Sequence, residues 1–199
     1  MAEVRTLVVE NAETFDICEK GDALLTEELS KIYNSKKTSK ISKGIAFPTT
    51  VSPNNIPAHL SPVSKDDEAN LVLKKGDVVK IMLGAQIDGF QAIIGETIVV
   101  GASESEPLTG QKADLVVGAW KASEAAIRTF TTKNRNWDIT NIVAKVAKSF
   151  GVTPVESMLT HNQERGVLYG PKEVILNPSK ENKSQIDCSE ERLVGIEGS

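Results

Sequence analysis

The chain has 199 residues, of which 40% are hydrophobic and 25% are charged, and its formal net charge is −4. This size and composition suit one globular domain with a substantial core, and they exclude a chain that is disordered throughout. The longest apolar runs, such as 98–100, are far shorter than the ~20 residues that a membrane span needs. The N-terminus carries Glu3, Arg5 and Glu10 around its apolar residues, unlike a secretory signal. We therefore expect a protein that resides inside the cell.

The cysteines and histidines are few. Cys18 and Cys188 are the only cysteines and have no Cys-x-x-Cys spacing, which excludes a disulfide framework or a cysteine zinc knuckle. We expect two unpaired thiols in a reducing compartment. His59 and His161 are the only histidines, so one chain cannot build a multi-histidine metal site.

The first predicted elements are a helix and a loop. Apolar residues recur at helical spacing over 14–34, with charged residues on the other face. Gly21 lies inside this helix at a cost of roughly 1 kcal/mol against Ala, which is usually tolerated for close packing. The polar stretch 35–43, here called the lysine loop, is predicted to be exposed; its basic residues are Lys36, Lys37, Lys40 and Lys43.

The middle of the chain predicts a β-meander. The segment 44–51 has the composition of a strand broken by Pro48, and strong turn residues follow at 52–55. Strands are expected over 78–83 and 85–87, and Asp88-Gly89 is a hairpin turn signal before a long strand over 90–100.

Helical spacing returns in the last part of the chain. Helices are predicted over 108–131 and 138–150, the second capped by Asp138 and stopped by Gly151. Trp120 and Trp137 lie in or beside these helices, where packing in the core or at a helix end is their expected role. Short strands are expected at 153–158 and 172–176, and a weakly ordered tail over 177–199. The pattern is that of one α+β domain.

Several segments in the same order carry a family resemblance. They are GIAFPTTVSPNN at 44–55, AHLSP at 58–62, the run 73–89, and MLTH at 158–161. Together they resemble the methionine aminopeptidase superfamily, and within it the proliferation-associated, curved-DNA-binding branch. The stretches CEKGD at 18–22, GQKAD at 110–114 and VILNP at 174–178 also resemble that branch.

The resemblance covers roughly 14–178 and implies an α+β, pita-bread (creatinase/aminopeptidase-like) fold. Full-length relatives are about twice this length. The resemblance thus implies a truncated domain over 1–176, containing the N-terminal half of the fold and part of the second half. Half of such a fold would leave apolar surface and a strand edge uncovered.

Aminopeptidases of this superfamily hold two divalent ions with two Asp, one His and two Glu, and a bridging water is the nucleophile. By resemblance, the two Asp positions are occupied here by Met82 and Ile93. Isoleucine cannot bind a hard cation, and methionine offers only a soft thioether. His161 matches the ligand histidine, while the two Glu have no counterpart in this sequence.

The resemblance therefore implies a pseudoenzyme with no catalytic residues, metal or cofactor. His59 matches the substrate-binding histidine, so His59 and His161 mark a remnant pocket. Two interpretations stay open: the histidines are hydrogen-bonded leftovers of an inherited pocket, or they bind a peptide terminus or a base.

The resemblance implies a non-catalytic adaptor that binds nucleic acid and ribosomes and acts in ribosome biogenesis or growth regulation. The expected partners are the ribosome or structured RNA, alternatively curved DNA, with further protein partners and no membrane. The expected locations are the cytoplasm and the nucleus, including the nucleolus. The alternatives are a degenerate metallo-aminopeptidase with residual activity and a gene fragment without independent activity.

The lysine loop is the one basic cluster that the sequence offers for nucleic-acid contact. Phosphate contacts from Lys36, Lys37, Lys40 and Lys43 would give modest, salt-dependent binding. No aromatic residue interleaves them, so the expected contact is independent of base sequence. A merely solvated loop is the alternative.

Overall fold

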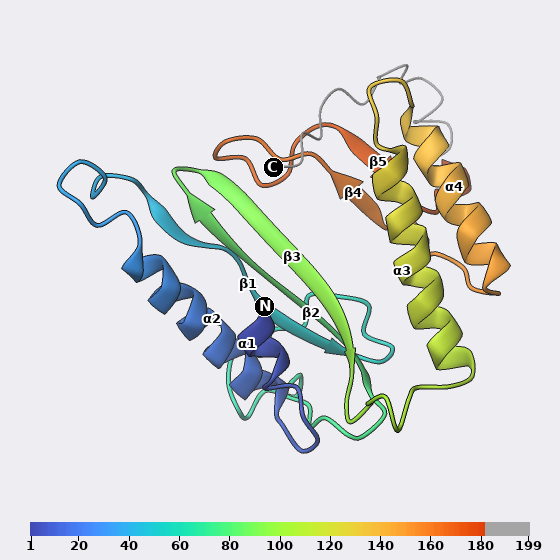
Figure 1. Ribbon diagram of the computed structural model, residues 1–199, viewed down its shortest axis with the longest axis horizontal. Helices are drawn as coiled ribbons and strands as arrows, with labels where there is room; N and C mark the ends of the chain where they lie inside the picture. Colours follow the sequence, from blue (N-terminus) through green and yellow to red (C-terminus); the bar gives the residue numbers. More distant parts are fainter. Residues whose placement is uncertain (182–199) are drawn as a thin grey trace. The chain divides into compact units, whose positions relative to one another are not determined.

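The computed structural model describes residues 1–181. These residues divide into two compact units, each described by itself (Figure 1). Unit 1 comprises Met1–Leu108 together with the short segment Arg165–Leu168. Unit 2 comprises Thr109–Glu164 and residues 169–181. No helix in residues 1–181 is long and apolar enough to cross a membrane.

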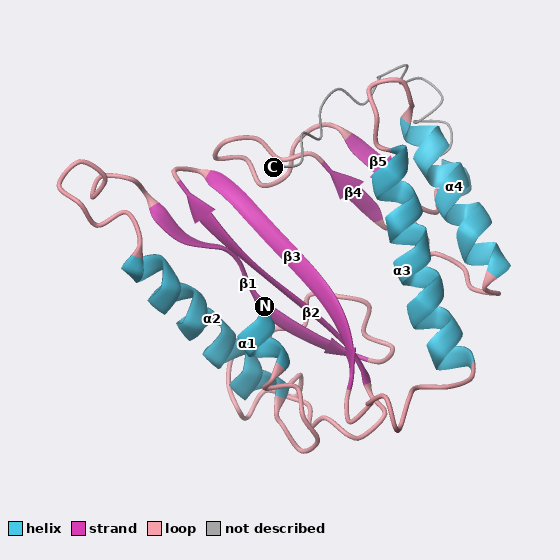
Figure 2. Ribbon diagram, viewed as in Figure 1, coloured by secondary structure: helices cyan, strands magenta, loops and turns pink. Residues whose placement is uncertain are grey.

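Unit 1 is an antiparallel sheet covered by helices on one face. Its elements are α1 (Ala2–Arg5), α2 (Thr14–Lys31), β1 (Lys43–Pro53), β2 (Val78–Ile87) and β3 (Phe90–Val99). The strand order is β1-β2-β3, and α1 and α2 lie on the same side of the sheet (Figure 2). The predicted β-meander is therefore confirmed, although α1 was not predicted.

Local backbone chemistry explains the strand connections. Asp88 and Gly89 both have positive φ, 55° and 81°, as a two-residue hairpin turn between twisted strands requires. β1 runs through Pro48 as one strand, where the sequence predicted a break. Its pairing with β2 shifts register between Ile45 and Thr50, and such an irregularity accommodates a proline that cannot donate to the ladder.

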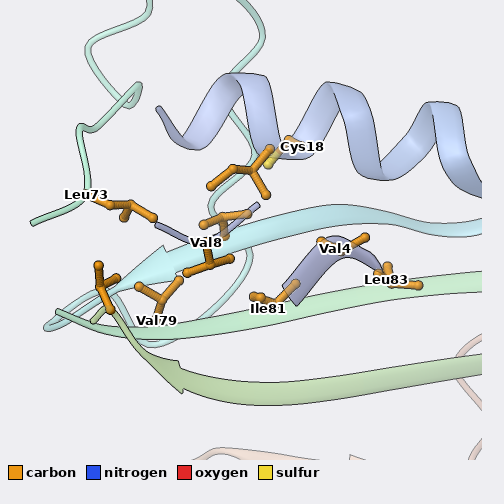
Figure 3. Packing of buried hydrophobic residues seen from close by; sticks show 10 residues of the cluster. Val4, Val8, Cys18, Leu73, Val79, Ile81 and Leu83 are labelled. Carbon is orange, nitrogen blue, oxygen red and sulfur yellow. The ribbon is translucent and has the colours of Figure 1, made fainter. Parts of the chain in front are cut away.

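The core of unit 1 lies between the sheet and its helices (Figure 3). Val79, Ile81 and Leu83 alternate along β2 and are almost fully buried, since every second side chain of a strand points to the same face. Residues from α1, α2, β1 and the loops complete this layer: Val4, Val8, Ile17, Cys18, Val51, Leu73 and Val100.

Unit 2 consists of two helices and a short hairpin. Its elements are α3 (Gln111–Thr129), α4 (Asn136–Ser149), β4 (Leu159–His161) and β5 (Glu173–Ile175), and the two strands pair antiparallel. A small core joins α3, α4 and β5 through Ala122, Ala126, Ile139, Val143 and Val174.

The structure corrects several predicted boundaries in unit 2. Asp138 is not the N-cap of α4 but the third residue of the helix, where its Oδ2 accepts the backbone N–H of Arg135 at 2.8 Å in a capping box. Gly151 follows the helix with φ of 69°, which confirms the predicted stop. The strand predicted at 153–158 is wrong: these residues are irregular with a turn at 156–157, and β4 begins at Leu159.

Two aromatic side chains also differ from the sequence prediction. α2 ends at Lys31, so Tyr33 leaves the helix with φ of 52° and is 46% exposed. Trp120 is 58% exposed, contrary to the expected packing in the core or at a helix end, whereas the indole Nε1 of Trp137 is buried. Most of the predicted tail, 182–199, lies outside the described residues.

Candidate functional site

The two strand positions that should carry metal ligands face the same side of the sheet. Met82 on β2 pairs with Gly95 on β3, and Gly84 pairs with Ile93. A Cβ built on Gly84 would lie 2.8 Å from Cγ1 of Ile93, and one built on Gly95 would lie 3.4 Å from Cγ of Met82. Met82 and Ile93 are thus diagonal neighbours on the face opposite the helix-covered core.

The residues on this face do not fit a pair of hard divalent cations. Such ions take several oxygen ligands at close range, and carboxylates supply most of them. Here a thioether and an aliphatic chain stand at the two matched positions, and Thr50 is the direct cross-strand partner of Met82. Residues 1–181 contain no group of three or more His, Cys, Asp or Glu side chains arranged to hold a metal.

Thr50 adds a buried polar group to this face, directly across from Met82. The residue is 2% exposed, and its Oγ1 has no hydrogen-bond partner among the described residues. A buried hydroxyl without a partner carries a desolvation cost of about 1–3 kcal/mol.

His59 lies on a segment that runs alongside β1. The N–H of Val51 donates to the carbonyl of Leu60 at 2.8 Å, and the N–H of Leu60 donates to Oγ of Ser52 at 3.1 Å. His59 itself is exposed, has φ of 65°, and tilts its ring against Phe47 at 5.4 Å between centroids. The ring of His59 is therefore held by an aromatic contact with Phe47 of β1.

His161 is the last residue of β4 in unit 2. Its ring lies 4.1 Å from the ring of Tyr169, and its Nδ1 is 3.2 Å from the carbonyl oxygen of Asn162. The hydroxyl of Tyr169 donates to Oε2 of Glu173, the cross-strand partner of His161. Burial and this carboxylate together raise the pKa of Tyr169. Because His59 belongs to unit 1, the remnant pocket that would unite the two histidines stays a prediction.

The four lysines of the lysine loop have two different roles: one anchors the loop, and the other three are exposed. Nζ of Lys43 donates to the carbonyl of Ile32 and, at 2.8 Å, to Oδ1 of Asn34, so this lysine closes the base of the loop. Lys36, Lys37 and Lys40 are exposed. The loop itself is folded by hydrogen bonds among its backbone and hydroxyl groups, including Ser39 N–H to the carbonyl of Ser35 at 2.8 Å.

The sequence analysis overlooked Tyr33 as a candidate binding residue. Helical periodicity placed it on the apolar face of the first helix, but α2 ends two residues earlier and leaves the ring exposed at the entry to the lysine loop. The signal that could have shown this is the run of residues 34–40, none of which is apolar and which cannot continue an amphipathic helix. An exposed aromatic ring beside lysines can stack on a base.

A second overlooked feature is the clamp that Arg165–Leu168 form on the β2–β3 turn. The Arg165 guanidinium donates to the backbone carbonyl of Asp88 at 2.8 Å and to its Oδ2 at 2.7 Å. The N–H of Gly166 donates to the carbonyl of Gly89 at 2.7 Å. The side chains of Arg165 and Asp88 are both more than 45% exposed, so their ion pair contributes little to stability. The contacts instead hold the tip of the hairpin in place.

Comparison with known proteins shows to which family the chain belongs. The model of metallopeptidase family M24 matches residues 1–181, nearly the whole chain. The chain belongs to family M24. Among curated M24-like relatives, the Curved DNA-binding protein of Schizosaccharomyces pombe is 52% identical over 176 residues, covering 88% of this chain and 45% of that protein.

Solved structures show the M24 pita-bread fold. A thermophilic Arx1 matches with a TM-score of 0.81 and 32% identity, over 90% of this chain and 53% of that one. A methionine aminopeptidase from Thermotoga maritima matches with a TM-score of 0.64 and 19% identity, over 89% of this chain and 65% of that one. The resemblance to the methionine aminopeptidase superfamily and the predicted fold are confirmed. This M24 chain spans about half the length of the curated relative and of Arx1.

Proposed function

We propose that this M24 chain is a non-catalytic adaptor that binds ribosomes or structured nucleic acid and acts in ribosome biogenesis or growth regulation, in the cytoplasm and nucleus. The observation that carries the first part is the pair Met82 and Ile93. They share one face of the sheet, at the positions where the family resemblance puts two metal-binding carboxylates. A site without these oxygens cannot hold two hard cations around a bridging water.

The lysine loop supports the second part. Lys36, Lys37 and Lys40 are exposed on a loop that folds on its own hydrogen bonds and is closed at its base by Lys43. A preordered set of cations loses little conformational entropy when it meets phosphates. The overall charge of −4 offers no general attraction, so the affinity must come from this local cluster.

Tyr33 adds an aromatic ring to the cations of the lysine loop. Its exposed ring can stack on an unpaired base, a contact that duplex DNA does not offer. This favours RNA with accessible bases, as on a ribosome, over duplex DNA. The name of the Schizosaccharomyces pombe relative supports nucleic-acid binding in general.

The test is sedimentation with ribosomes from a native extract at low and high salt. We expect the full chain to pellet with ribosomes at low salt and to be released at high salt. The variant Lys36→Glu/Lys37→Glu/Lys40→Glu should stay in the supernatant. The matched control, Lys133→Glu/Lys145→Glu/Lys148→Glu, reverses the same amount of exposed charge in unit 2 and should pellet normally. Equal binding by both variants, or equal loss, would contradict the assignment.

The family itself favours a second candidate, a metallo-aminopeptidase with residual activity. We expect no hydrolysis of a methionyl peptide in the presence of added cobalt or manganese, because Met82 and Ile93 supply no oxygen ligands. If the chain hydrolyses the peptide and the substitutions Met82→Ala and Ile93→Ala leave that activity intact, the metal is held elsewhere in the protein. The proposal that the chain is non-catalytic would then fail.

A further inference from the structure

One hydroxyl of the lysine loop is more open than the others. Ser35 and Thr38 share a hydrogen bond between their hydroxyl oxygens at 2.7 Å. Oγ of Ser42 accepts the side-chain amide of Gln86 at 3.4 Å. Ser39 is exposed, and its Oγ has no hydrogen-bond partner in the part of the chain that the structure describes, residues 1–181. An enzyme can therefore reach the hydroxyl of Ser39 without breaking a side-chain contact.

Ser39 also lies among the exposed cations of the loop. Lys36 and Lys37 stand three and two positions before it, and Lys40 follows it directly. The N–H of Ser39 donates to the carbonyl of Ser35 at 2.8 Å, the spacing of an α-helical turn, in which residues three apart lie on the same side. Lys36 and Ser39 therefore share one side of the turn. Protein kinases select substrates by charge pattern, and lysines before a serine suit a kinase with an acidic substrate groove.

The loop can unwind into such a groove without disturbing the rest of unit 1. The N–H groups of Thr38 and Ser39 both donate to the carbonyl of Ser35, so these hydrogen bonds begin and end within the loop. Among the described residues, the core of unit 1 includes none from 35–43. Opening an exposed segment that is held by its own hydrogen bonds costs far less than global unfolding. Ser39 is therefore accessible to a kinase in the folded protein.

We propose that Ser39 is a phosphorylation site for a basophilic serine kinase, and that its phosphate switches off nucleic-acid binding by the lysine loop. The co-reactant is MgATP. Oγ of Ser39 forms a bond to the γ-phosphorus, the bond from that phosphorus to the β,γ-bridging oxygen breaks, and ADP leaves with its electron pair. The hydroxyl proton passes to the catalytic carboxylate of the kinase.

The switch rests on the proposed function, in which Lys36, Lys37 and Lys40 contact phosphates of the nucleic acid. A phosphoserine carries a charge of about −1.5 to −2 at pH 7 and three strong acceptor oxygens. It therefore cancels about half or more of the positive charge of these lysines, and its oxygens accept hydrogen bonds from their ammonium groups. Ammonium groups paired in this way are withdrawn from the nucleic acid. Each phosphate contact that is lost weakens binding and reduces its salt dependence.

The first measurement asks whether Ser39 is modified. The full 199-residue chain is incubated with MgATP and the catalytic subunit of cyclic-AMP-dependent protein kinase, a basophilic kinase, and its peptides are analysed by tandem mass spectrometry. We expect one phosphoryl group on Ser39 and incorporation that is slower by about 10-fold or more in Lys36→Ala/Lys37→Ala. The matched control Lys133→Ala/Lys145→Ala removes two exposed charges from unit 2 and should react normally. An unmodified Ser39, or equal rates in the two double variants, would overturn the proposal.

The second measurement compares the phosphorylated and unphosphorylated chains in sedimentation with ribosomes over a range of salt concentrations. We expect phosphorylation to weaken binding by about 10-fold or more at low salt and to flatten its salt dependence. Ser39→Ala, an exposed substitution that keeps all the lysines, should bind like the parent before and after treatment with kinase and MgATP. Equal binding of the two forms of the parent would overturn the switch and leave the proposed function standing. If the unphosphorylated chain fails to pellet, the proposed function is refuted and the switch with it.

Discussion

Gly21→Ala should destabilise unit 1, although alanine is the better helix former. Gly21 is buried in α2, where it lies directly on β1. An added Cβ would sit 2.5 Å from Oγ1, 2.6 Å from Cγ2 and 2.9 Å from Cβ of Thr49. To restore ordinary contact, helix and strand must separate by about 1 Å.

Thr49 has little freedom to move away. Its side chain is β-branched on a strand, and its backbone N–H donates to Oδ1 of Asp22 at 2.7 Å, which ties the strand to the next residue of the helix. Overpacking of this kind costs about 1–3 kcal/mol, while the gain in helix propensity from Gly to Ala is about 1 kcal/mol. We expect a net loss of about 1 to 2 kcal/mol, because three atoms clash and the strand is anchored.

Urea unfolding followed by circular dichroism measures the change. Ala23→Gly, at an exposed position of the same helix, calibrates the propensity contribution. Thr49→Ala removes the two nearest atoms, Oγ1 and Cγ2. Because Oγ1 of Thr49 has no hydrogen-bond partner in residues 1–181, this substitution breaks no hydrogen bond. Gly21→Ala should therefore cost about 1 kcal/mol less in the Thr49→Ala variant than in the parent. If Gly21→Ala stabilises the protein by as much as Ala23→Gly destabilises it, the close-packing argument is refuted.

Three further outcomes follow from individual side chains. Asp67 accepts backbone N–H groups from Ala69 and Val63, which lowers its pKa, so its contribution to stability is present above pH ~4 and is lost as the pH falls through the lowered pKa. Thermal unfolding of Asp67→Asn should fall below the parent by more at pH 6 than at pH 3; an equal difference at both pH values would contradict this. Burial raises the pKa of the Cys18 thiol to about 11, so in a Cys188→Ser variant a thiol reagent at pH 8 should react only as fast as the protein unfolds. Fast labelling in the native state would disprove it. Arg165→Ala should lower global stability by less than about 1 kcal/mol while speeding hydrogen exchange at the Asp88–Gly89 turn; a large global loss would mean that the clamp is a core element.

Much of unit 1 follows from local sequence. The alternation Val79, Ile81, Leu83 marks a half-buried strand, and Asp88-Gly89 supplies the positive φ values that a two-residue turn demands. The family resemblance alone led to the prediction that Met82 and Ile93 stand where relatives carry carboxylates, and the structure adds that the two side chains lie on one face of the sheet. These properties depend on neighbours in the chain or on the pleat of one strand.

Other features depend on contacts that are distant in the chain. The closure of the lysine loop beyond the end of α2 depends on Lys43, which donates to the carbonyl of Ile32 from eleven residues away. The start of β4 at Leu159 is set by pairing with β5 across a long loop, which no local propensity encodes. Trp120 illustrates the limit best: the sequence shows a large apolar residue, which normally belongs in a core. Whether that residue is covered depends on what packs against α3, and only the tertiary structure reveals that the described chain leaves it exposed.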